Sequence, residues 1–186
     1  MLSDEKNQDI KVRKAVFEDI PAIKELIKAS SRFLAKGYYS FEQIEAALKS
    51  AWGVDSQLIF DATYFVSEYK SKIVGCGGWS RRRTLFGGDQ QIGRSEELLD
   101  PQTDPARIRA FFIHPEWARK GIGRIILSES EKEAQLAGFR ALELVATLSG
   151  QRFYESLGFQ KEGSKSFPLQ GGIEIEFISM GKRLNW

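Results

Sequence analysis

The segment 106–127 constrains this chain most, because it orders a buried strand, a turn, a basic glycine-bearing loop and a helix. The first turn of a helix carries amide groups without intrahelical partners, and the helix dipole adds partial positive charge there. Gly121 and Gly123 let the backbone approach a ligand closely, because no Cβ stands in the way. The cations beside them are Arg119, Lys120 and Arg124. The segment therefore predicts an anion site that suits a phosphate group.

Two common phosphate-binding patterns do not describe this loop. A Walker-type loop needs G-x-x-x-x-G-K-[ST], which occurs nowhere in the chain. A dinucleotide fingerprint needs G-x-G-x-x-G/A, but Ile126 occupies the third small position. That fingerprint also usually opens its domain, whereas this loop lies past the middle of the chain.

The loop resembles the acetyl-CoA-binding motif of the GNAT superfamily (GCN5-related N-acetyltransferases), which is usually written [Q/R]-x-x-G-x-[G/A]. On that alignment Ala118 takes the first position, so a side-chain contact is absent while the backbone cradle is kept. A second segment, Phe153-Tyr-Glu-Ser-Leu-Gly-Phe159, is similar to the family's F-Y-x-x-x-G-F signature after its fifth strand. Two motifs in the family's order and spacing are far more specific than either alone. The resemblance extends more weakly from Ile10 to Leu184.

The resemblance implies one α/β (α+β) N-acetyltransferase domain over residues 1–186, with a mixed, mostly antiparallel central sheet flanked by helices. Its fourth and fifth strands would splay apart, and the pantetheine arm of acetyl-CoA would lie in the gap. The implied activity is acetyl-CoA-dependent transfer of an acetyl group to an amine, which attacks the thioester directly. Acetyl-CoA is then a co-substrate, and no metal is expected.

The apolar pattern of the chain predicts the same series of elements. We expect residues 1–8 to be disordered and residues 86–104, rich in Gly, Asp, Gln and Pro, to form an excursion between strands. Ser40 is the expected N-cap of the second helix and Gly138 the C′ residue of the third. Their inward stripes are Phe41, Ile44, Ala47 and Leu48, and Ile122, Ile125, Ile126 and Ala134. The expected strands are 10–15, 62–69, 72–80, 106–113, 140–147, 159–167 and 172–183, and the helices are 18–30, 41–50, 121–137 and 150–157.

Composition narrows the functional classes. The formal charge of +2 is too small to argue for a nucleic-acid partner, and no apolar run is long enough for a membrane span. The polar start of the chain argues against a secretory signal. Cys76 is the only cysteine, so no intrachain disulfide can form. We therefore expect a cytoplasmic protein without a nucleic-acid or membrane partner.

The resemblance also implies which residues bind the co-substrate. Backbone amides of residues 119–124 would hold the CoA diphosphate, and backbone groups of Phe112 and Ile113 would bond the pantetheine. Thr147 falls where many relatives carry an Asn, so its hydroxyl either reaches the cofactor or belongs to an ordinary strand end. The predicted binding set is Phe112, Ile113, Arg119, Lys120, Gly121, Ile122, Gly123, Arg124 and Thr147. The three cations are either phosphate contacts or part of a solvated face.

Tyr154 would be the general acid beside the thiolate leaving group, again by resemblance. A thiol titrates near 8.5 and a tyrosine near 10, so the mismatch costs only about 2 kcal/mol. The alternative is a tyrosine that only packs beside Phe153 and Leu157.

The general base is not evident from the sequence. A lysine-like amine with a pKa of about 10.4 needs a group that removes its proton at neutral pH. Many relatives use a Glu near strand four, but residues 107–113 contain no acid. The remaining candidates are Glu143 and Asp104, with Glu68 farther away. His114, the only histidine, is better explained as a turn residue before Pro115.

Other conspicuous residues have a structural interpretation beside the functional one. Cys76 lies in an apolar strand, which favours a buried structural thiol over a nucleophile. The run 81–83 of three arginines would either meet an acidic substrate or form a solvated strand end. Trp52, Trp79 and Phe86 would line an acceptor pocket or pack in the core. No Cys/His cluster has the spacing of a zinc site.

Two other hypotheses stay open beside the N-acetyltransferase. One is an acyl-CoA-binding module of the same fold with little catalysis, suggested by the missing acid on strand four and by the substitutions at Ala118 and Thr147. The other is nucleotide binding unrelated to CoA. The acceptor, a small-molecule or peptide amine, cannot be read from the chain, and both a monomer and a homodimer fit it.

Overall fold

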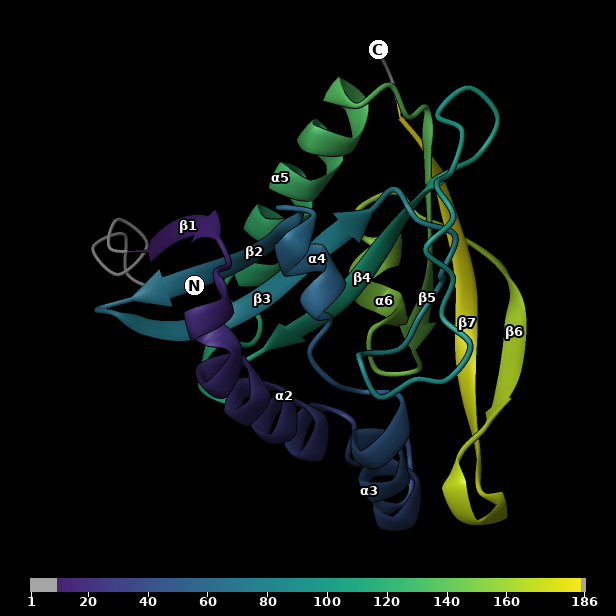
Figure 1. Ribbon diagram of the computed structural model, residues 1–186. Helices are drawn as coiled ribbons and strands as arrows, with labels where there is room; N and C mark the ends of the chain where they lie inside the picture. The colour runs from purple at the N-terminus through teal and green to yellow at the C-terminus, as the bar shows by residue number, and fades with distance from the viewer. Residues whose placement is uncertain (1–9, 185–186) are drawn as a thin grey trace.

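The computed structural model describes residues 10–184, so the expectation for residues 1–8 lies outside the described part. Seven strands form one sheet in the order β1-β2-β3-β4-β5-β7-β6, antiparallel except for the β4–β5 pair (Figure 1). The strands are β1 Ile10–Lys14, β2 Tyr64–Tyr69, β3 Lys72–Ser80, β4 Ala106–Ile113, β5 Ala141–Thr147, β6 Gln160–Pro168 and β7 Glu174–Arg183. The α-helices are α2 Ile20–Leu34, α3 Phe41–Ser50, α4 Ser56–Phe60, α5 Ile122–Leu136 and α6 Gln151–Glu155.

Helices cover both faces of the sheet (Figure 1). Buried side chains of α2, α3 and α4 form one apolar cluster with the sheet, which includes Ile23, Ala47 and Leu58. Those of α5 and the buried Tyr154 of α6 belong to a second cluster. The expected α/β fold, with a mostly antiparallel sheet flanked by helices, is confirmed.

The β4–β5 pair separates soon after it begins. The two strands pair only at Ala106–Leu142 and Arg107–Glu143, whereas β5 then pairs with β7 along its whole length. Figure 1 shows the resulting gap between the β1–β4 part of the sheet and the β5–β7–β6 part. The predicted splay between strands four and five is therefore present, and it leaves one edge of β4 without a strand neighbour beyond Arg107 among the described residues.

An extra residue in β4 creates a bulge at this open edge. The register pairs Gly78 with Arg109 and Cys76 with Phe112, so β4 takes three steps where β3 takes two. Ala110 accommodates the difference with a φ of 55°, a left-handed conformation that costs energy for a residue with a Cβ. As a result Ile108 and Phe111, three residues apart, both belong to the cluster on the α5 side.

Most predicted elements are present, with four corrections. The first helix runs to Leu34, four residues past its predicted end, and the short helix α4 was not predicted. Phe41 is 71% exposed and Ile125 is 37% exposed, so neither belongs to the buried stripe predicted for its helix. Phe41 is the first residue of α3, and Ile125 is the fourth residue of α5. Ser40 caps α3 as predicted, accepting from the Gln43 amide, and Gly138 follows α5 with a φ of 93°.

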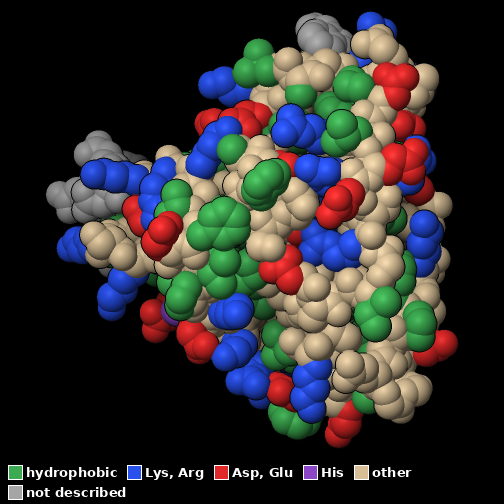
Figure 2. All heavy atoms as spheres, in the orientation of Figure 1, with side chains coloured by type: hydrophobic (Ala, Val, Ile, Leu, Met, Phe, Trp, Pro, Cys, Tyr) green, Lys and Arg blue, Asp and Glu red, His purple; other side chains and the backbone are tan. Residues whose placement is uncertain are grey.

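The outer surface mixes charges of both signs. Figure 2 shows Lys and Arg side chains interspersed with Asp and Glu over the face seen in Figure 1. Within residues 10–184, no helix combines the length and the apolar character that a membrane crossing needs.

Candidate active site

The predicted anion-binding loop leads directly into helix α5. Gly121 is the N-cap residue with a φ of 88°, and Arg119 also has a positive φ, of 64°. The first helical hydrogen bond at this end joins the Ile125 amide to the Gly121 carbonyl at 3.1 Å. The amides of the first turn before it are left for another partner. That turn contains no acidic residue, so nothing there opposes an anion.

The three cations of the loop are free to meet a ligand. Arg119 and Arg124 are exposed, and Lys120 lies 5.2 Å from the ring centroid of Trp117. None of these three side chains forms an ion pair with another described residue. Their charges are therefore not neutralised by the protein itself.

The two sequence motifs meet physically at Gly123. A Cβ at this position would lie 2.8 Å from the ring of Phe153, which is closer than real contacts allow. The start of α5 and the F-Y segment of α6 are therefore packed against each other, and the glycine makes that approach possible. This contact brings the loop and the second motif side by side.

The backbone of β4 presents alternate residues to the open edge. The His114 amide donates to the Val74 carbonyl on β3 at 2.9 Å. Phe112, two residues earlier, has the same orientation, so its backbone groups face β3. The backbone groups of Phe111 and Ile113 face the open edge. There the Ile113 amide donates to Ser30 Oγ of α2 at 3.2 Å. Of the two predicted pantetheine contacts, only Ile113 lies on the free edge, and Phe111 lies beside it.

Tyr154 lies at the same edge, inside a group of aromatic rings. It packs edge-to-face against Phe111, Phe153 and Phe159, with ring centroids 6.3, 4.9 and 5.6 Å away. The residue is 8% exposed, and its hydroxyl bonds no other described residue. Burial raises the pKa of Tyr154 above its ordinary value, so the phenol keeps its proton. The hydroxyl is not among the fully buried polar atoms that lack a partner, so this end of the ring is left available to a ligand.

Thr147, at the end of β5, uses its hydroxyl within the protein. Its Oγ1 accepts from the Gly150 amide at 3.1 Å and lies 3.0 Å from Ser149 Oγ. The hydroxyl thus organises the turn before α6.

The two base candidates lie together, away from Tyr154. Glu143 forms an ion pair with Arg107 where β4 and β5 still pair. Asp104, just before β4, accepts from the Asp100 amide at 2.9 Å. From Arg107 to Phe111 the strand rises by about 13 Å, so neither carboxylate shares the edge where Tyr154 lies. Glu68 is also occupied, because Arg13 donates to it at 2.5 Å.

A buried ionic cluster on the opposite face was not predicted. Arg109 of β4 pairs with Asp55 at 2.8 Å and donates to the carbonyls of Thr84 and Gly87. Asp55 is 0% exposed and also pairs with Arg94, so the excursion is fastened to the sheet. Burial lowers the pKa of the Arg109 guanidinium, and the Asp55 carboxylate opposes that shift.

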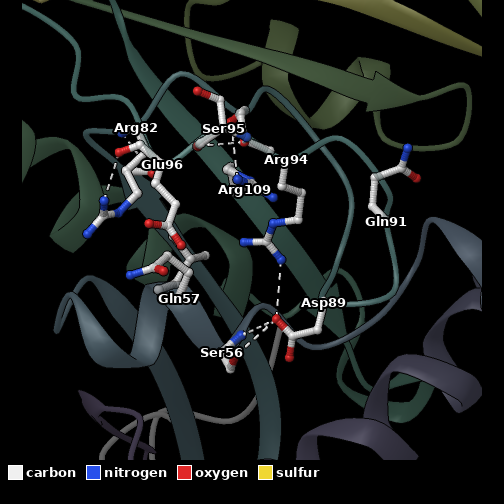
Figure 3. Close-up of a pocket in the computed structure, with 12 residues that line it drawn as sticks. Ser56, Gln57, Arg82, Asp89, Gln91, Arg94, Ser95, Glu96 and Arg109 are labelled. Carbon is white, nitrogen blue, oxygen red and sulfur yellow. Dashed lines mark hydrogen bonds and ion pairs between the residues drawn. The ribbon is translucent and has the colours of Figure 1, made fainter.

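Figure 3 shows Arg94 and Arg109 in a polar cavity of about 300 Å³, which α4 and the excursion enclose. Arg94 also reaches Asp89 at 3.2 Å. Nearby, Arg82 makes two hydrogen bonds of 2.7 Å to Asp61. The guanidinium groups of this cavity are thus satisfied by carboxylates of the protein.

The remaining candidates are placed in cores and turns. Trp52 and Phe86 both contact the Phe177 ring, whereas Trp79 packs on Phe139 in the other cluster, so the three do not line one pocket. Cys76 is fully buried, as expected for a structural thiol. His114 Nδ1 accepts from the Glu116 amide at 3.3 Å, which matches a turn residue.

A family model described as an acetyltransferase (GNAT) domain matches residues 60–161, more than half of the chain. The chain belongs to the GNAT acetyltransferase family. The matched range contains the bulge, the predicted anion-binding loop and the F-Y segment. No curated protein sequence matches the chain significantly.

Solved GNAT structures share the fold at low sequence identity. A GCN5-related N-acetyltransferase from Rhodopseudomonas palustris is 18% identical with a TM-score of 0.69, covering 94% of this chain and 95% of that one. The PaiA N-acetyltransferase from Thermoplasma acidophilum, solved with coenzyme A, is 19% identical with a TM-score of 0.66, covering 94% and 99%. The ribosomal-protein-S18-alanine N-acetyltransferase from Escherichia coli is 16% identical with a TM-score of 0.57, covering 95% of each.

Within residues 10–184, this GNAT chain holds no cluster of three His, Cys, Asp or Glu side chains suited to a metal ion.

Proposed function

We propose that this chain is an acetyl-CoA-dependent N-acetyltransferase. The observation that carries the proposal is the continuity between the open edge of β4 and the free amides at the start of α5. Acetyl-CoA has a diphosphate at one end and a thioester at the other, so it needs both features close together. Membership of the GNAT family and the coenzyme A in the PaiA structure support the same co-substrate.

Each feature would hold one part of the co-substrate. The amides of residues 119–124 would bind the diphosphate, assisted by the charges of Arg119, Lys120 and Arg124. The backbone carbonyls of Phe111 and Ile113 would bond the pantetheine arm as a neighbouring strand does, since the Ile113 amide already donates to Ser30. The thioester would then lie near Tyr154, whose ring contacts that of Phe111.

The reaction forms a bond between the acceptor nitrogen and the acetyl carbon and breaks the carbon–sulfur bond. The leaving thiolate takes a proton or a hydrogen bond from the Tyr154 hydroxyl, which burial keeps protonated. The amine loses a proton in the same process. Glu143 lies beside Arg107, about 13 Å along the strand from Phe111, and Asp104 precedes that strand. We therefore propose that water carries this proton away.

A CoA-release assay across amine classes tests the proposal. Small amines, amino acids and peptides with free N-termini or lysines are supplied with acetyl-CoA, and the new thiol is measured. We expect saturable turnover with at least one class of amine. The Tyr154→Phe variant should turn over the same amine more slowly. If calorimetry at millimolar acetyl-CoA or CoA registers no binding to the folded protein, the proposal is wrong.

An acyl-CoA-binding module is the second candidate, and one observation favours it. The β4 residue before the bulge is Arg109, whose charge is neutralised by Asp55, and β4 contains no acid that could serve as a base. Tight binding of acetyl-CoA without transfer to any amine class would support this candidate over the enzyme.

A further inference from the structure

The bulge of β4 is held by a side chain from a strand two places away. Tyr64 of β2 is 0% exposed, and its hydroxyl donates to the Ala110 carbonyl at 3.0 Å. To reach β4 the ring must cross β3, and Gly78 lies beneath it there. A Cβ at Gly78 would come within 3.1 Å of the Tyr64 ring and 2.3 Å of the Thr63 carbonyl. The glycine therefore permits the crossing.

A second buried group fixes the orientation of this phenol. Cys76 Sγ lies 3.2 Å from the Tyr64 hydroxyl and 3.8 Å from the Ala110 carbonyl. A phenol has one proton, and the carbonyl oxygen is a better acceptor than sulfur. Burial raises the pKa of Cys76 to about 12 and that of Tyr64 well above its ordinary value, so both stay neutral. The lone cysteine thus belongs to a hydrogen-bonded group that ends at the bulge.

The position of the bulge gives this contact a consequence for the site. Ala110 holds a left-handed φ of 55°, which persists only where surrounding contacts determine it. Arg109 on one side is anchored by Asp55, and Phe111 on the other side contacts Tyr154. Any change in the Ala110 backbone therefore turns the Phe111 amide, which faces the open edge.

We propose that Tyr64 is a positioning residue of acetyl transfer: its hydroxyl holds the Ala110 bulge so that the Phe111 amide points to the thioester carbonyl. This inference rests on the proposed function. Tyr64 touches no substrate and acts through the backbone of β4. A hydrogen bond from that amide would polarise the carbonyl and stabilise the negative charge that develops during attack.

The test is Tyr64→Phe, which removes one oxygen and keeps the ring. The matched control is Tyr69→Phe on the same strand, where the hydroxyl bonds no other described residue. The main measurement is the carbonyl ¹³C chemical shift of bound [1-¹³C]acetyl-CoA, which requires no acceptor. The Kd of CoA, the kcat with any accepted amine and the Tm complete the set.

For Tyr64→Phe we expect the bound carbonyl shift to move at least halfway to its free value. We expect kcat to fall about 10-fold, because one oxyanion donor loses its alignment. The Kd of CoA should stay within about twofold, since the diphosphate site lies elsewhere. The Tm should fall by about 2–6 °C, the effect of one buried hydrogen bond in a domain of this size. Tyr69→Phe should leave the carbonyl shift and kcat unchanged.

A rescue variant gives a second, independent test. Glycine adopts a positive φ without steric cost, so Ala110→Gly in the Tyr64→Phe protein should keep the bulge without the phenol. We expect it to recover at least half of the lost carbonyl shift. A double variant that stays at the level of Tyr64→Phe would contradict control through the bulge.

The outcomes separate this inference from the function on which it rests. A wild-type protein that binds no acetyl-CoA overturns both. A wild-type protein that binds it, while Tyr64→Phe shows the same carbonyl shift and kcat, overturns only the role of Tyr64.

Discussion

Two groups of cationic side chains on opposite sides of the sheet differ in their partners. At the start of α5, Arg119, Lys120 and Arg124 make no ion pair within the described chain. Across the sheet, Arg94 and Arg109 share the buried carboxylate of Asp55. The first group has its charge available for a ligand, and the second has it balanced within the fold.

This difference separates binding from stability. A free, exposed cation contributes little to folding, but it attracts an anionic ligand. A buried, paired cation contributes nothing to ligand binding. Removing its partner, however, leaves an unpaired charge in a region of low dielectric constant and so lowers stability. We therefore expect changes in the first group to alter CoA affinity alone and changes in the second to alter stability alone.

The largest expected effect is that of Asp55→Asn. The amide keeps the shape but leaves Arg94 and Arg109 without their shared anion, so the free energy of unfolding should fall by about 3–5 kcal/mol. Urea unfolding measures it. The control is Asp89→Asn, which removes an exposed partner of Arg94 and should cost under about 1 kcal/mol. Equal losses for both variants would remove the distinction between the two groups.

Tyr154→Phe should act on turnover and not on folding. We expect kcat to fall about 10- to 100-fold, at the lower end of the range for a general acid, with an unchanged Kd for CoA. Because the hydroxyl has no partner among the described residues, its removal should leave the Tm equal or slightly higher. Burial raises the pKa of Tyr154, so the wild-type kcat should not decline between pH 7 and about 9 through loss of its proton. A wild-type kcat in the variant would eliminate the acid role.

Gly123→Ala tests whether the loop and the F-Y segment are energetically coupled. The new Cβ meets the Phe153 ring at 2.8 Å, so α5 and α6 must separate. We expect a loss of stability of about 1–3 kcal/mol, together with weaker CoA binding. Combining Gly123→Ala with Phe153→Leu, which leaves space for the new Cβ, should restore part of the lost stability and part of the lost CoA affinity. Additive effects in this double-mutant cycle would show that the two positions do not interact.

The smallest effects should come from single substitutions of the loop cations. Arg119→Gln, Lys120→Gln and Arg124→Gln should each weaken CoA binding by about 2- to 5-fold, less at high salt, with no change in Tm. Arg83→Gln, which removes an exposed partner of Glu97, is the control and should leave CoA affinity unchanged. If the control weakens binding as much, the effect is one of net charge.

Features that depend on neighbouring residues were predictable from the sequence. Ser40 and Gln43 cap α3 within a few residues, and Gly121 and Gly138 occupy positive φ at the two ends of α5. The apolar pattern gave the strand positions within about two residues, because alternation reflects burial directly. Helix α4 was missed because five residues are too few for a helical period.

Features that depend on distant contacts were not predictable. Nothing in the string 107–113 indicates a bulge at Ala110, and the hydroxyl that bonds its carbonyl comes from Tyr64 on another strand. The pairing of Arg109 with Asp55 joins residues far apart in the chain, and no local pattern predicted this ionic cluster. Glu143 was likewise a candidate base from the sequence, but the register places Arg107 opposite it.

The sequence by itself determined the family, the order of the strands and longer helices along the chain and the basic glycine-bearing loop before α5, because each is specified by short-range patterns of glycine, charge and apolar residues. Only the tertiary structure decided which charges are neutralised, which backbone groups of β4 face the gap and which tyrosine holds the bulge. Those properties arise where strands and loops distant in sequence meet, and no local pattern specifies such a meeting.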